Sequence, residues 1–517
     1  MYQTALLLLS GPLRLLIESI GPYLSWTNKK IAKCLYVKLE PELYNPISKS
    51  DSINLKRLST VVPVVYHKAS SLCKNVDVRV LLGNIEQSKL TQSKQLNFDA
   101  IVTNCDPTDI RNYLKQNYGK SCDNIIKLND IDTPVSQVEL ESDDTEFQTF
   151  DTVCLGGTFD RLHNGHKVFL SEAALKATKK IIVGVSDGVT LKKKILWELI
   201  EPVEKRIKDV TDFLEDIDSS LKYEVVPIYD VYGPTITLPD IDCLVVTTET
   251  RIGGEKVNNE RKNRGMSEVK LHIIDVVENT DRSKDEDEKL SSSTKRMHLL
   301  GKPLKISKPS LISKPYCVLL RGHPLSGKSF VANKLQLSGI PVLCCDEMLS
   351  AIFHKDSELK KFIIKEFGEE ICNDEDSFVF EKLVIACLKN KEKKDCLAQL
   401  VLTKLTSALQ QVFQVYSEQG SHTILVKDSS IFEGCELGIK VNEIWATILP
   451  ASESIKLFKE HYLVTEEEAG KLIDSLPSNE QYVATANVLF CNKWSPDTTQ
   501  QQVNRAFSYL KSIQKST

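Results

Sequence analysis

The chain has 517 residues, enough for about three domains on length alone. Its 41% hydrophobic and 26% charged content is typical of a globular protein, and a net charge of −4 excludes the strong basic field of a nucleic-acid-binding protein, so we expect no nucleic-acid partner. The 14 cysteines lack CxxC pairs and regular spacing, which excludes a zinc or disulfide scaffold and favours buried thiols in the reducing cytoplasm.

Residues 1–26 are the most apolar part of the chain. Arg14, Glu18 and two prolines interrupt the apolar run, so it is too broken to span a membrane, and nothing in it resembles a secretory signal. Two interpretations remain open. The segment is either a strand and a helix packed into the first domain, or a peripheral contact with the mitochondrial membrane surface.

Short strand-like runs at 34–39, 76–82 and 100–103 predict an N-terminal α/β domain over residues 1–130. No chemical motif indicates its role. Residues 131–150 turn acidic and lose the apolar pattern, as a linker does.

Strands alternate with helices over residues 151–301. This alternation predicts a Rossmann-like parallel sheet with helices on both faces, in which ligands bind at the carboxyl ends of the strands. The strand-like runs are 153–155, 181–185, 223–227, 242–246 and 271–275, and a helix is expected from Pro202 to Leu214.

A glycine-rich turn follows the first of these strands and leads into a helical pattern at 167–177. Gly156 and Gly157 open the turn, and its amides and the helix start predict an anion site. His163 and His166, three residues apart, face the same side. The combination indicates nucleotidyl transfer. A metal site is a second interpretation, although no third ligand follows at zinc spacing, and two solvent-facing histidines are a third.

A cluster of hydroxyls and cations at 291–296 predicts a second anion site, unless it is a capped helix and no more. Residues 302–315 read as a linker. From 316 to 517 a third block begins with the strand 316–320.

The third block opens with a complete G-x-x-x-x-G-K-[ST] motif between a strand and a helix. Its members are Gly322, Gly327, Lys328 and Ser329. The loop amides would wrap phosphates, Lys328 would neutralise them, and Ser329 would be a ligand of Mg²⁺.

The run His163-Asn164-Gly165-His166 resembles the HxGH signature of the nucleotidyltransferase superfamily, and Thr158 matches that family's other phosphate-contacting position. The order of an HxGH block and a P-loop block resembles the bifunctional coenzyme A synthases, which join phosphopantetheine adenylyltransferase to dephospho-CoA kinase. The resemblance implies an α/β protein: an N-terminal α/β domain, a Rossmann-like nucleotidyltransferase domain, then a P-loop kinase-like α/β domain. It also implies ATP, 4′-phosphopantetheine and dephospho-CoA as substrates and products, with Mg²⁺ as cofactor.

By this resemblance His163 and His166 would donate to the ATP phosphates and Arg296 would bind the leaving pyrophosphate. Lys192 or Lys194 would hold the attacking phosphate of phosphopantetheine. The family's second phosphate motif corresponds to Ser292, Ser293 and Thr294.

The kinase-like block departs from its family. Cys344 stands where the family has the first Asp of an Asp-x-Asp pair, so Asp346 and Asp428 are the remaining candidates, and the lid stretch 455–472 contains no arginine. We therefore expect ATP binding, with phosphoryl transfer open. The alternatives are a fully bifunctional synthase, a kinase-like block that serves as a nucleotide-sensing scaffold, and a nucleotidyltransferase outside coenzyme A synthesis.

Overall fold

The computed structural model describes most of the chain, in two compact units, Met1–Thr294 and Lys295–Thr517. The described residues are 1–40, 52–83, 98–118, 122–128, 147–275, 277–279, 282–305, 315–373, 378–419, 423–429, 431–432 and 435–515. Most of the predicted linkers at 131–150 and 302–315 therefore lies outside the described residues.

The first unit begins with a five-stranded parallel sheet in the order β3-β2-β1-β4-β5. Its strands are β1 (Tyr2–Ser10), β2 (Ile31–Glu40), β3 (Asp77–Val80), β4 (Ala100–Thr103) and β5 (Ile125–Lys127). Its helices are α1 (Leu13–Asn28), α2 (Ser52–Leu72) and α3 (Pro107–Tyr118). Leu6, Leu7, Leu8 and Leu9 are fully buried in the central strand, so residues 1–26 form the strand and helix of the first interpretation.

The second sheet of this unit is also parallel, in the order β10-β9-β6-β7-β8. Its strands are β6 (Phe150–Gly157), β7 (Ala177–Ser186), β8 (Lys222–Ile228), β9 (Cys243–Thr247) and β10 (Lys270–Ile274), and its helices are α4 (Asn164–Lys176), α5 (Val203–Ile217), α6 (Arg251–Asn263) and the start of α7 (Ser292–Met297). Because β6 pairs with β7 on one side and β9 on the other, the chain reverses direction across the sheet at β6, where ligands of such folds bind.

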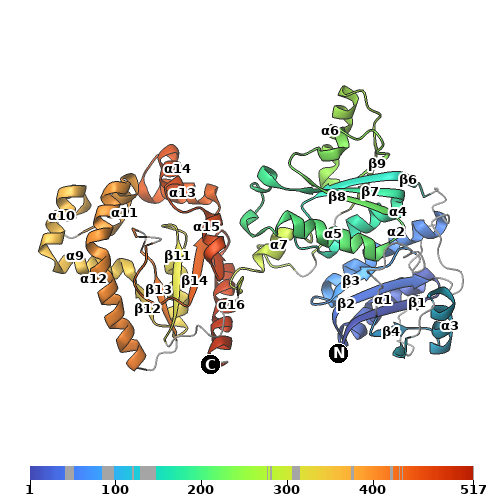
Figure 1. Cartoon of the computed structure of the whole chain (residues 1–517), viewed down its shortest axis with the longest axis horizontal. Helices are drawn as coiled ribbons and strands as arrows, with labels where there is room; N and C mark the ends of the chain where they lie inside the picture. The colour runs from blue at the N-terminus through green and yellow to red at the C-terminus, as the bar shows by residue number, and fades with distance from the viewer. Residues whose placement is uncertain are drawn as a thin grey trace. The chain divides into compact units, whose positions relative to one another are not determined.

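The two sheets of the first unit, predicted as separate domains over residues 1–130 and 151–301, pack against each other. One hydrophobic core runs from Val37 and Val62 through Leu170 and Phe213, and α2 packs against α4 (Figure 1). The two sheets share this core, so they lie in one compact unit, Met1–Thr294. The short helix α7 crosses that boundary.

The second unit has a five-stranded parallel sheet in the order β12-β13-β11-β14-β15. Its strands are β11 (Tyr316–Gly322), β12 (Val342–Cys344), β13 (Thr423–Lys427), β14 (Glu443–Ile448) and β15 (Val488–Cys491). Its helices are α8 (Lys328–Leu337), α9 (Cys345–Lys355), α10 (Ser357–Phe367), α11 (Phe380–Lys389), α12 (Lys391–Glu418), α13 (Ala451–Tyr462), α14 (Glu466–Asp474), α15 (Asn479–Thr485) and α16 (Pro496–Lys515).

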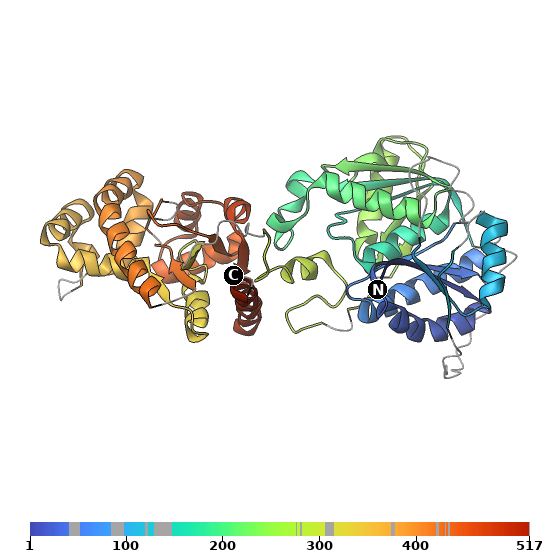
Figure 2. The ribbon, with the colours of Figure 1, turned by 60° about the horizontal axis from the view of Figure 1, so that its bottom comes forward.

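Two apolar clusters cover the faces of this sheet. Helices α9 to α12 pack on one face, and α8 and α16 pack on the other, as Figure 2 also shows for the orange and dark-red helices. The predicted parallel α/β fold is thus confirmed in both units. Among the described residues, no helix has the length and apolar character needed to cross a membrane.

Candidate functional site

The two predicted histidines lie face to face at the carboxyl end of β6. Their ring centroids are 3.8 Å apart with 23° between the planes. His163 is the residue before α4, and its extended backbone lets His166, in the first turn of the helix, lie over it. A Cβ at Gly165 would come within 3.1 Å of the His163 ring, so glycine leaves room for the stack.

The turn between β6 and α4 has two residues in an uncommon backbone conformation. Phe159 and Arg161 both have φ near 49°, a left-handed conformation that costs residues other than glycine free energy. Buried Asp160 holds the turn, because its Oδ1 accepts from Arg161 Nη1 at 2.9 Å and from the Glu201 amide at 3.0 Å. Neighbouring structure thus fixes the strained turn.

Arg206 on α5 ties the ends of two strands together. Its guanidinium, 1% exposed, donates to the carbonyls of Thr158 (2.8 Å), Ser186 (2.7 Å) and Glu201 (2.8 Å) and pairs with Asp187 at 3.1 Å. The backbone at Thr158 is thereby fixed beside Gly156 and Gly157. A Cβ at Gly157 would lie 3.0 Å from the Phe159 ring, which is why the strand ends on glycine.

His166 is held as a neutral imidazole. Burial lowers its pKa to about 4; Asp160 opposes the shift and the nearby Lys194 ammonium adds to it. Its Nδ1 is buried with no hydrogen-bond partner among the described residues. A neutral ring carries one N–H donor, so His166 is suited to donate to a phosphate oxygen.

The other predicted residues of this site lie on neighbouring segments. Lys192 and Lys194 are exposed after a short 3-10 helix, with the Lys192 ammonium 5.6 Å from the Trp197 ring centroid. Ser292 Oγ donates to the Asp160 carbonyl at 2.8 Å, which brings the second hydroxyl cluster to the turn after β6. Ser293 donates to Asp287 at 2.6 Å.

Ser291, the first residue of the predicted cluster at 291–296, accepts a hydrogen bond from the Thr294 amide at 3.1 Å and caps α7. Arg296 lies on the same short helix within the second unit. Its role stays a prediction.

The first sheet holds the helix that carries the histidines. Asn164, between the two histidines, donates to the Tyr66 carbonyl at 3.2 Å and to Ser70 at 2.9 Å, both on α2. Lys167, directly after His166, bonds to Asp77 and to the Val78 carbonyl (2.8 Å) on β3. Helix α2 and strand β3 therefore fix the two ends of the first turn of α4.

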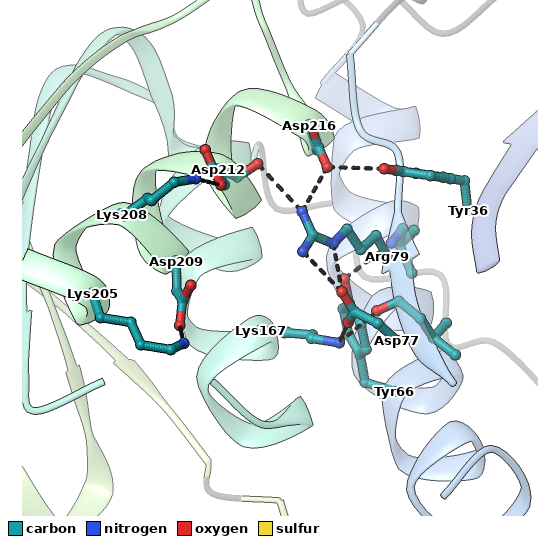
Figure 3. Close-up of polar contacts among 12 residues, drawn as sticks. Tyr36, Tyr66, Asp77, Arg79, Lys167, Lys205, Lys208, Asp209, Asp212 and Asp216 are labelled. Atoms are coloured by element: carbon teal, nitrogen blue, oxygen red, sulfur yellow. Dashed lines mark hydrogen bonds and ion pairs between the residues drawn. The ribbon is translucent and has the colours of Figure 1, made fainter. Parts of the chain in front are cut away.

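Arg79 extends this buried cluster to α5 (Figure 3). It pairs with Asp77 at 2.8 Å and with Asp216 at 2.5 Å, and Asp216 also accepts from the Tyr36 hydroxyl at 3.0 Å. Two cations face two carboxylates, so the cluster of Lys167, Asp77, Arg79 and Asp216 is balanced in charge. Burial alone would raise the pKa of Asp77, but the two cations bring it below its usual range.

The predicted phosphate-binding loop of the second unit lies between β11 and α8. Gly322 and Gly327 have positive φ, and a Cβ at either would lie within 2.2 Å of a neighbour, Thr447 or Asn492 respectively. Ser326 donates to the His323 carbonyl at 2.7 Å. The loop is thus a tightly packed turn that requires both glycines.

Lys328 folds back over the loop, where it bonds to the Gly322 carbonyl and, at 3.0 Å, to the His323 carbonyl. Ser329 accepts a hydrogen bond from Lys427 Nζ at 3.1 Å. Where the motif predicts Mg²⁺, the structure has an ammonium group, and this arrangement does not fit a metal ligand at Ser329. No group of three or more metal-ligating side chains occurs anywhere in the described ranges.

The two candidate kinase carboxylates, Asp346 and Asp428, differ in burial and in ion pairing. Asp428 is fully buried and pairs with Arg321 at 3.0 Å, a structural ion pair. Asp346 is half-buried in the first turn of α9. Burial raises the pKa of the Cys344 thiol, although Lys427 opposes this, so Cys344 is a protonated thiol and a poor base.

Helices α13 and α14, which cover the predicted lid stretch, carry lysines that pair with carboxylates of the same two helices. Lys459 lies 3.2 Å from Glu466, and Lys471 lies 2.6 Å from Glu467. These cations are exposed surface pairs of small energetic weight.

Several supporting residues were missed from the sequence. Asp160 and Arg161 lie in the glycine-rich turn just before the histidines, and that position was the available signal. Arg206, Asp77 and Lys427 had none, because each acts through a partner distant in the chain.

Two family models match the chain. The one described as "Cytidylyltransferase-like" matches residues 154–300, and the one described as "Dephospho-CoA kinase" matches residues 316–497. These ranges contain the histidine pair and the phosphate-binding loop respectively, in the order that the resemblance implied.

Curated relatives match a smaller part of the chain. An uncharacterized protein of Schizosaccharomyces pombe is 45% identical over 24% of this chain, and a phosphopantetheine adenylyltransferase of Saccharomyces cerevisiae is 41% identical over 25%. The chain spans 39% and 42% of the lengths of these two relatives.

A phosphopantetheine adenylyltransferase of Pyrococcus abyssi is 35% identical over 30% of this chain and 97% of its own length. Nearly the whole of that relative is thus matched. Through this part, the chain belongs to the phosphopantetheine adenylyltransferase family.

Proposed function

We propose that the chain transfers an adenylyl group from ATP to 4′-phosphopantetheine, giving dephospho-CoA and pyrophosphate. The observation that carries the proposal is the stacked pair His163–His166 at the carboxyl end of β6, with a neutral His166. Membership of the adenylyltransferase family supports the choice of acceptor.

In this reaction a phosphate oxygen of 4′-phosphopantetheine forms a bond to the α-phosphorus of ATP, and the bond to the bridging oxygen of the β-phosphate breaks. Pyrophosphate leaves with that electron pair. The attacking group is already an anion, so the protein supplies positioning and charge stabilisation rather than a nucleophile. His163 and His166 donate to the phosphates of ATP. Mg²⁺ accompanies the ATP phosphates and supplies further charge neutralisation when bound.

The remaining predicted residues bind the attacking phosphate and the leaving pyrophosphate. Lys192 or Lys194 holds the attacking phosphate, and the Lys194 charge is near enough to lower the pKa of His166. The hydroxyls of Ser292, Ser293 and Thr294, with Arg296, receive the leaving pyrophosphate. The hydrogen bond from Ser292 to the Asp160 carbonyl supports this role because it keeps the hydroxyl cluster at the same turn.

We assign ATP binding to the second unit, through the loop from Gly322 to Ser329. Phosphoryl transfer to dephospho-CoA is disfavoured, because Cys344 is protonated and Asp428 is engaged with Arg321. A fully bifunctional synthase would have to use Asp346 as the base. A nucleotide-sensing module is the alternative from another class.

The experiment supplies the full chain with ATP and 4′-phosphopantetheine and identifies the products. Dephospho-CoA with pyrophosphate supports the proposal, and accumulation of CoA identifies the bifunctional enzyme. His166→Ala should lower the rate of adenylyl transfer by ~10²–10³-fold, as for loss of an oxyanion donor. His67→Ala, an exposed histidine on α2, is the matched control and should retain the rate. Equal rates in the two variants would refute the role of the pair.

A cytoplasmic location belongs to the same proposal and is supported by 14 free cysteines, many of them buried. Contact of residues 1–26 with the mitochondrial surface has little support, because the side chains of β1 from Ala5 to Leu9 are buried in the sheet. Leu15, 51% exposed, is the large apolar side chain that α1 leaves on the surface among its described residues.

A further inference from the structure

The phosphate-binding loop of the second unit has a lysine where its family would place a metal. In P-loop enzymes the hydroxyl after the lysine is a ligand of Mg²⁺. Here the Ser329 hydroxyl accepts a hydrogen bond from Lys427 Nζ at 3.1 Å. A divalent ion bound to the same oxygen would lie against an ammonium group, and two like charges at that distance repel strongly.

The backbone fixes Lys427 in this place. It is the last residue of β13, which pairs with β11 on one side and β12 on the other. In the register of the sheet it lies opposite Leu320 and Cys344, at the carboxyl edge where the loop begins. Lys427 therefore belongs to the wall of the nucleotide site rather than to a freely moving surface loop.

The groups around Lys427 leave its charge available. Cys344 stands where the family has a carboxylate, and burial keeps that thiol protonated. In the part of the chain that the structure describes, Lys427 is in no ion pair, and its ammonium group is within hydrogen-bond reach of the Ser329 hydroxyl and the Cys344 thiol, both of which are neutral. The cysteine at 344 and the lysine beside Ser329 act in the same direction, because both make the site unfavourable for Mg²⁺ and favourable for an anion.

We propose that the Lys427 ammonium takes the place of Mg²⁺, so that the second unit binds a nucleoside 5′-polyphosphate without a divalent cation. This rests on the proposed binding of ATP by the loop and adds how that site is charged. Lys328 and Lys427 would neutralise the phosphate chain from two sides, while the loop amides contact it.

Metal-free binding would also leave the bound nucleotide intact. A fixed lysine on Ser329 provides charge for binding, but it does not bridge the β- and γ-phosphates as a metal ion does in transfer. The nucleotide is then a ligand that is held and released intact, and the second unit works as a nucleotide-binding module attached to the adenylyltransferase.

The test measures ATP binding to the full chain by calorimetry, once with excess EDTA and once with excess Mg²⁺. The first unit also binds ATP, so the Lys328→Ala chain is titrated in parallel and the difference between the two chains gives the second unit's site. We expect that site to bind in EDTA with an affinity within about threefold of its affinity in Mg²⁺. Lys427→Met should weaken metal-free binding by about tenfold or more and make binding depend on Mg²⁺.

Two control variants distinguish the effect of a cation at position 427 from the effect of a change in the net charge of the chain. Lys427→Arg keeps a cation and should keep binding in EDTA, and Lys365→Met removes an exposed lysine on α10 and should change nothing. Binding that requires Mg²⁺ in the unsubstituted chain would overturn the role of Lys427 and leave ATP binding by the second unit intact. Absence of the second site in both conditions would overturn ATP binding by this unit, and this inference with it, while adenylyl transfer by the first unit is assayed separately.

Discussion

Removing the Asp77 carboxylate should destabilise the first unit more than removing the lysine that it pairs with. Lys167 contacts Asp77 in the cluster that Figure 3 shows. The Lys167 side chain is 5% exposed, whereas the Asp77 side chain is 37% exposed. In Asp77→Ala the buried Lys167 ammonium keeps its hydrogen bond to the Val78 carbonyl but loses the carboxylate that balances its charge. In Lys167→Met the remaining carboxylate still pairs with Arg79 and is partly solvated.

Breaking a buried ion pair by removing one partner costs about 3–5 kcal/mol. Water reaches Asp77, so we lower the expected cost of Asp77→Ala to about 2–3 kcal/mol and that of Lys167→Met to about 1 kcal/mol. The double variant leaves no unpaired charge on α4 and should cost about 1–2 kcal/mol. The two substitutions are therefore expected to couple by roughly 1.5–2 kcal/mol.

The assay is thermal unfolding of the full chain by calorimetry, with the first unit identified as the transition that these variants move. A loss of 2–3 kcal/mol corresponds to a fall of about 3–5 °C in Tm for a unit of this size. Additive effects in the double variant, or a larger loss in Lys167→Met than in Asp77→Ala, would refute the idea that this pair holds α4 to the N-terminal sheet.

Three further outcomes are expected. Burial lowers the pKa of His166 to about 4 in the folded chain from 6.5 in the unfolded chain, so protonation of His166 should not reduce the rate of adenylyl transfer above about pH 5. The unfolded chain binds this proton more tightly, so the free energy of unfolding should fall as pH drops from 6.5 to 4. His166→Ala should flatten that slope in acid unfolding curves. Cys344→Asp should raise any trace formation of CoA from dephospho-CoA without reaching the rate of a full kinase, because the lid lacks arginine, and a fully active variant would contradict this. Deleting residues 1–26 should yield insoluble protein, since β1 is central in its sheet; a soluble, redistributed protein would restore the membrane interpretation.

The fold was largely predictable because parallel strands with both faces covered are continuous apolar runs. The runs at 153–155 and 181–185 became β6 and β7, and the glycine turn after β6 carries the stacked histidines. The grouping of two sheets in one unit was not predictable, because it depends on contacts such as Lys167 with Asp77, ninety residues apart. The sequence around Asp77 or Lys167 does not indicate which distant residue will pair with it.

The ion pair between Arg321 and Asp428 shows the same limit in the second unit. Asp428 was a kinase candidate on its resemblance to a family motif, and the structure gives it a partner from β11. Ser329 was a metal ligand by motif, and the structure gives it a lysine from β13. Motifs indicated the loop correctly but not the charges that the fold brings to it.

The buried cysteines make it possible to measure transient unfolding separately in each unit. Cys154 and Cys243 lie within the second sheet of the first unit, and Cys317 and Cys387 lie within the second unit, each at most 1% exposed. Burial raises the pKa of all four to about 12, so an alkylating reagent has neither access nor a thiolate to attack while the fold is closed. Labelling of these sites in mass spectrometry therefore follows the rate at which each sheet transiently opens, separately for the two units of one unmodified chain.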